Sequence, residues 1–191
     1  MSTKKSVFDA LMAQGVMPSQ NPSPPRVDIN RIKAARYKEN RSKDPYGLKS
    51  VFGQLFVALK NVRYETLRGR KNQQMFNVNF AGEGSIDVGG PYRDLLSQVC
   101  TELMSDSLPL FLPCANRKND VGQGRDKRVL NPGASASLQL EQLTFLGALL
   151  GIALRTSFTL NLDLPSIVWK QLLGEKPDVS DLEAVDKVRA P

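Results

Sequence analysis

The feature that most constrains this fold is an apolar segment near residue 150. From Leu138 to Arg155 a helix would be apolar on nearly every side, because leucines recur at helical spacing and other apolar residues fill the positions between them. The leucines are Leu143, Leu146, Leu150 and Leu154, and the residues between them include Phe145, Ala148, Leu149, Ile152 and Ala153. We predict a long helix that starts at Ser135 or Ser137 and ends near Arg155. A helix apolar on all sides needs cover, so we place it at the centre of the domain.

Shorter elements of both kinds are predicted around this helix. Residues 48–59 have a single apolar helical face, residues 74–80 alternate as a strand with one wet face, and the glycine-rich residues 81–90 predict a turn and a short second strand. We also expect a helix from Pro91 that buries Leu95, Leu96, Val99, Cys100 and Leu103. A strand within Leu108–Pro113, a polar loop over 116–128 and a brief return strand at Val129–Leu130 should follow. The last predicted elements are a helix from Pro165 through Leu173, ended by Gly174, and a helix capped at Ser180. The predicted fold class is α+β, mainly α, with a central apolar helix and small β-hairpin elements.

Positive charge is concentrated in the first third of the chain. The net charge is +7, and residues 26–71 carry thirteen Lys or Arg against four Asp or Glu. We predict that residues 1–47 are a basic, proline-containing arm and linker, partly disordered, and that the folded body spans residues 48–191. The alternative is a basic interaction module that binds nucleic acid or an acidic protein surface. Without a helix-turn-helix pattern, zinc-ligand spacing or an aromatic-rich platform, we do not expect a nucleic-acid partner.

The absence of histidine restricts the chemistry of the chain. The 191 residues include no histidine and two cysteines, which excludes Ser-His-Asp and Cys-His arrangements and histidine-bearing zinc sites. We expect both thiols to be structural, Cys100 on an apolar helical face and Cys114 in a more accessible place. Glu83 and Asp87 lie four residues apart in the glycine-rich turn, which is weak support for an acid–base pair. We therefore predict no catalytic, metal-binding or cofactor-binding residue.

The sequence predicts neither a secretion signal nor a membrane span. Asp9 interrupts the apolar residues near the N-terminus, and the longest uncharged apolar run, Phe145–Leu154, is shorter than the ~20 residues that cross a bilayer. We expect a soluble, cytoplasmic protein.

Six blocks of sequence resemble the amino-terminal lobe of the HECT ubiquitin ligases. The blocks, in chain order, are Phe76–Arg93, Leu110–Cys114, Asn131–Pro132, Phe145–Ala153, Leu164–Gly174 and Asp181–Asp186. The stretches Gly-Gly-Pro-Tyr-Arg and Leu-Pro-Ser-Ile-Val-Trp-Lys are most similar to the large HECT ligases that also carry RCC1-type repeats. The resemblance covers roughly Leu48 to Asp186.

This resemblance implies a ubiquitin-protein transferase that works by a thioester relay. In the family, a ubiquitin-conjugating enzyme docks on a later part of the amino-terminal lobe. Ubiquitin passes to a cysteine in a carboxy-terminal lobe and then to a substrate lysine. Neither Cys100 nor Cys114 occupies the acceptor position, so no catalytic residue carries over. We expect a truncated HECT domain that is inactive alone, whose parent has the conjugating enzyme and ubiquitin as partners.

The resemblance also marks four residues as a structural signature of the family. They are Gly89, Gly90, Arg93 and Trp169. We expect them to determine the fold rather than to take part in chemistry, the glycines through backbone geometry and the arginine through a charge pair or a helix cap.

Overall fold

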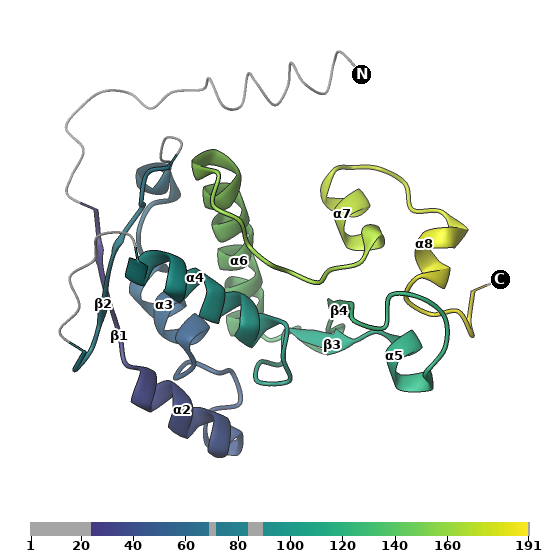
Figure 1. Cartoon of the computed structure of the whole chain (residues 1–191), viewed down its shortest axis with the longest axis horizontal. Coiled ribbons are helices and arrows are strands. Elements are labelled where there is room, and N and C mark those ends of the chain that lie inside the picture. Colours follow the sequence, from purple (N-terminus) through teal and green to yellow (C-terminus); the bar gives the residue numbers. More distant parts are fainter. Residues whose placement is uncertain (1–23, 69–71, 84–89, 191) are drawn as a thin grey trace, which may run out of the picture.

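The structure, a computed structural model, describes residues 24–68, 72–83 and 90–190. The elements in chain order are β1 (Arg26–Ile29), α2 (Arg31–Glu39), the 3-10 turn η1 (Arg41–Lys43), α3 (Val51–Leu59), the 3-10 turn η2 (Tyr64–Leu67), β2 (Asn77–Phe80), α4 (Gly90–Leu103), β3 (Phe111–Pro113), α5 (Ala115–Asn119), β4 (Arg128–Leu130), α6 (Ser137–Thr156), α7 (Ser166–Leu172) and α8 (Val179–Glu183). Helices predominate over the short strands, which confirms the predicted α+β, mainly α class. In Figure 1, β3 and β4 lie between a larger part containing α2, α3, α4 and α6 and a smaller part containing α5, α7 and α8.

The strands β1 and β2 form a parallel pair, although they lie far apart in the sequence. Their register places Val27 beside Val78 and Ile29 beside Phe80. These four side chains are all buried. On β2, Val78 and Phe80 are buried while Asn77 is exposed, so the predicted alternation of this strand is confirmed. The second strand of the predicted hairpin falls on residues 84–89, outside the described residues.

Residues 26–47 pack against the rest of the fold. The helix α2 begins after Asn30, whose side chain caps its first turn. Tyr37 on α2 is 3% exposed, and its hydroxyl donates a hydrogen bond to the carbonyl of Ser107. The structured body therefore starts before Leu48, the boundary expected from the sequence. The helix α2 buries only Ala34 and Tyr37, so these tertiary contacts rather than a continuous apolar face hold it in place.

The helices α3 and α4 pack together through their apolar faces. Ser50 caps α3 by accepting from the amide of Gly53 at 2.8 Å, and the Glu102 carboxylate of α4 accepts from the amide of Phe52 at 2.9 Å. Phe145 of α6 packs against Phe52, with ring centroids 5.9 Å apart. Every predicted apolar-face residue that lies within α3 or α4 is buried, namely Val51, Phe52, Leu55, Phe56 and Leu59, and Leu95, Leu96, Val99, Cys100 and Leu103. Leu48, which was predicted to begin the first of these faces, lies before α3 and is half-buried.

The helix α6 is long, as predicted, and it is covered on only one side by the described residues. It starts at Ser137, one of the two predicted starts, and ends at Thr156. Its buried side includes Phe145, whereas Leu140 and Leu154 are 52% and 63% exposed. The expectation of a fully enclosed central helix is therefore wrong for this chain, because an apolar pattern shows what a helix needs to bury and not what covers it. By length and composition α6 is the one helix in the described ranges that could cross a membrane, a test that core helices of soluble proteins also pass.

The smaller part of the fold is joined to the larger one by a two-stranded sheet. β3 pairs with β4 in the antiparallel sense, as the sequence predicted. The predicted polar loop between them contains the short helix α5. Arg128, the last residue of that predicted loop, is the first residue of β4; it is buried, and its guanidinium lies 2.6 Å from the carboxylate of Asp106. The last helix is capped by Asp178, which accepts from the amide of Asp181 at 3.1 Å, and not by Ser180 as predicted.

Candidate functional site

The signature residues lie at separate places in the fold. Gly89 is outside the described residues, and Gly90 and Arg93 belong to the first turn of α4. Trp169 lies on α7, keeps 37% of its surface exposed and donates its indole N–H to the carbonyl of Leu164 at 3.1 Å. The three described positions therefore belong to two separate helices, α4 and α7, and do not define a catalytic pocket.

The start of α4 is anchored by aromatic rings from two other segments. Tyr92 is fully buried between Phe76, 4.8 Å away between ring centroids, and Phe158, 5.1 Å away. The guanidinium of Arg93 lies over the same Phe158 ring, 5.5 Å from its centroid. A cation over an aromatic face is attracted by the ring quadrupole, so Arg93 contributes a cation–π contact to this junction, a role that the expectation of a charge pair or cap did not include.

Gly90 has an ordinary helical environment. Its φ lies outside the left-handed region, and a Cβ atom added there meets no other atom within 4 Å. Neither of the two physical reasons for requiring glycine, positive φ or close approach, applies at this position. The expected geometric role is thus not visible at Gly90.

Glu83 takes part in a surface cluster that holds α2 against the fold. The Arg31 guanidinium stacks 3.5 Å above the centre of the Phe80 ring, lies 3.5 Å from the Glu83 carboxylate and bonds Asp94 of α4. Asp87, the other carboxylate considered for an acid–base pair, lies outside the described residues. The contacts of Glu83 are those of a structural ion pair.

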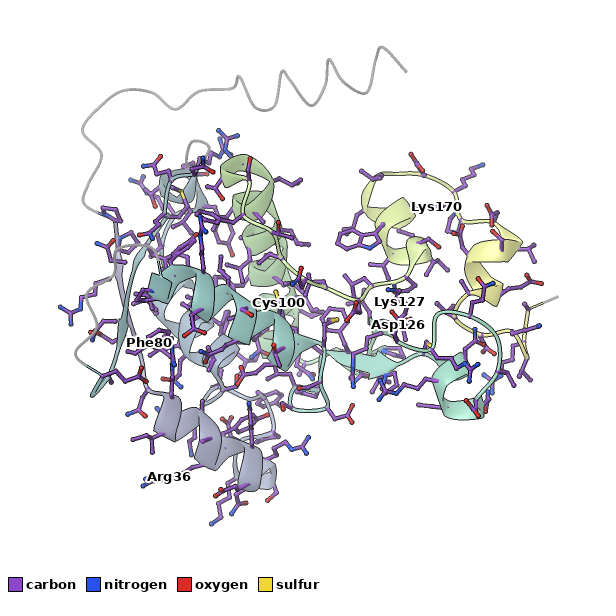
Figure 2. All side chains as sticks on the ribbon, in the orientation of Figure 1. Arg36, Phe80, Cys100, Asp126, Lys127 and Lys170 are labelled. Carbon is purple, nitrogen blue, oxygen red and sulfur yellow. The ribbon has the colours of Figure 1, made fainter. Side chains whose placement is uncertain are left out.

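Both thiols are enclosed by the fold. Cys100 is 4% exposed on α4 (Figure 2), and Cys114 is 0% exposed with its Sγ 3.2 Å from the carbonyl oxygen of Gly124. Burial raises the pKa of the Cys100 thiol, because a thiolate loses its solvation there. The expectation that Cys114 is accessible is wrong, since the turn that follows α5 covers it.

A buried asparagine joins α5 to the end of α8 and to the segment that follows it. Asn116 is 0% exposed, and its amide nitrogen donates to the carbonyls of Gln123 at 2.9 Å and Glu183 at 2.8 Å. Its side-chain oxygen accepts from the amide of Lys187 at 2.7 Å. Sequence reasoning missed this residue, because a single asparagine in a polar loop carries no periodic signal.

A second polar cluster joins α7 to α8. The ammonium group of Lys170 lies 3.0 Å from Asp178 and 2.5 Å from Asp181, and Figure 2 shows it between the two helices. Asp181 is buried and also accepts from the hydroxyl of Ser166 at 2.5 Å. These bonds, chiefly that from Lys170, lower the pKa of Asp181. The cluster fixes the angle between two short helices and holds no pair of free acid and base.

The described residues contain no group of His, Cys, Asp or Glu side chains suited to a metal ion. The basic region also has structural uses for part of its charge, since Arg31 pairs with Glu83 and Asp94 and Arg41 donates to the carbonyl of Asp106. Within the described ranges, the candidate residues therefore make structural contacts and do not form a reaction centre.

Comparison with known proteins identifies what this framework belongs to. Residues 97–190 match the family described as HECT-domain (ubiquitin-transferase). The chain is also 36% identical over 188 residues, 96% of its length, to the mouse E3 ubiquitin-protein ligase HERC2. The chain therefore belongs to the HECT-type ubiquitin ligases and is a fragment of such a ligase.

Two further relatives agree with this assignment. The human HERC2 ligase is likewise 36% identical over 96% of the chain, and the human probable E3 ubiquitin-protein ligase HECTD4 is 30% identical over 185 residues, again 96% of the chain. The chain spans only 4% of the length of the HERC2 proteins and 5% of HECTD4. The similarity to HERC2 confirms the resemblance read from the six sequence blocks. These comparisons do not favour the basic interaction module.

Proposed function

We propose that this chain supplies structural framework to the amino-terminal lobe of a HECT domain and does not itself accept ubiquitin. In the parent ligase the family implies ubiquitin and a ubiquitin-conjugating enzyme as partners. Transfer there would follow the thioester relay, in which a cysteine thiolate attacks the thioester carbonyl carbon and the conjugating enzyme's thiolate leaves. The role of the present residues is to hold the lobe in shape.

The observation that carries this proposal is the burial of both thiols. A nucleophile has to reach the carbonyl carbon of a thioester on another protein, and the reactive form is the thiolate. Cys100 and Cys114 are 4% and 0% exposed, and burial raises the pKa of Cys100. The chain also has no histidine that could serve as a base. Neither thiol meets the conditions for accepting ubiquitin.

The test is a transthioesterification assay with the 191-residue chain, activating enzyme, charged conjugating enzyme and ubiquitin. We expect no ubiquitin adduct that dithiothreitol removes, while a complete HECT domain in a parallel reaction forms one. We also expect both thiols to react slowly with a thiol reagent in the native chain and rapidly in denaturant. A dithiothreitol-sensitive adduct that disappears in Cys114→Ala or Cys100→Ala would show that the proposal is wrong.

A further inference from the structure

We draw no further inference here: the strongest candidate, the partly exposed outer side of α6 with the hollow that it shares with η2, supports none because nothing in the structure shows what covers it.

Discussion

Replacing Asn116 with alanine tests a fully buried polar side chain that joins separate segments of the fold. The side chain makes three hydrogen bonds of 2.7–2.9 Å, and no part of the residue is exposed. Two of them join α5 to Glu183 and Lys187, and the third reaches the carbonyl of Gln123 in the turn that follows α5. At about 1 kcal/mol for each bond, plus the cost of leaving buried partners unpaired, Asn116→Ala should lower the free energy of unfolding by about 3–5 kcal/mol. That is a large part of the roughly 5–15 kcal/mol that stabilises a domain.

Urea denaturation measures the global loss, and hydrogen exchange shows where it occurs. We expect the amides of Val121 and Lys187, which bond the backbone and side-chain oxygens of Asn116, to exchange about a hundredfold faster or more. Asn119→Ala is the matched control, because this exposed asparagine ends the same helix and its loss should cost less than about 0.5 kcal/mol. If Asn116→Ala is as stable as Asn119→Ala and the two amides keep their protection, the reasoning is wrong.

Two further substitutions test the larger part of the fold. Phe145→Ala removes a ring that packs against Phe52 and Phe56, with ring centroids 5.9 and 5.7 Å apart, and should lower the free energy of unfolding by about 3–5 kcal/mol. Leu154→Ala on the exposed side of α6 should lower it by less than about 0.5 kcal/mol. Equal losses in denaturation would contradict the one-sided burial of α6. Burial raises the pKa of Glu102 above its ordinary value, because a buried carboxylate loses its solvation, so the native state binds this proton more tightly than the unfolded state does. Its contribution to stability is present below the unfolded pKa and is lost as the pH rises through the folded pKa. The free energy of unfolding of the wild type relative to Glu102→Gln should therefore fall with rising pH in that window, and a flat difference would refute the assignment.

Local patterns were enough to predict the elements that bury one continuous face. The apolar spacing of α3 and α4 predicted which side chains they bury, and the run over residues 138–155 predicted the length of α6 to within a residue or two at each end. The pairing of β3 with β4 followed from two short apolar runs around a polar loop. These predictions hold because burial on one side of a helix or strand repeats with the period of the backbone.

The partner of each element was harder to predict. Val27 and Ile29 are buried because β1 pairs with β2, which lies about fifty residues further on, and a four-residue strand among prolines and basic residues gives no sign of that pairing. For this reason the sequence predicts an arm over residues 1–47, although residues 26–47 pack against the fold. The candidate site shows the same limit. The sequence identified the signature residues Arg93 and Trp169, but it did not predict that Arg93 lies over the ring of Phe158 or that Trp169 donates to the carbonyl of Leu164.

The sequence by itself determined the helical content, the length of α6, the absence of histidine and the six blocks that place the chain among the HECT-type ligases. Only the tertiary structure decided that both thiols are enclosed, that Asn116 joins two segments and that one side of α6 is open. Whether a thiol is exposed, and whether a buried side-chain amide finds hydrogen-bond partners, depends on segments that are remote in sequence and adjacent in space. Such contacts have no sequence period, because they arise when elements pack and not when each element forms.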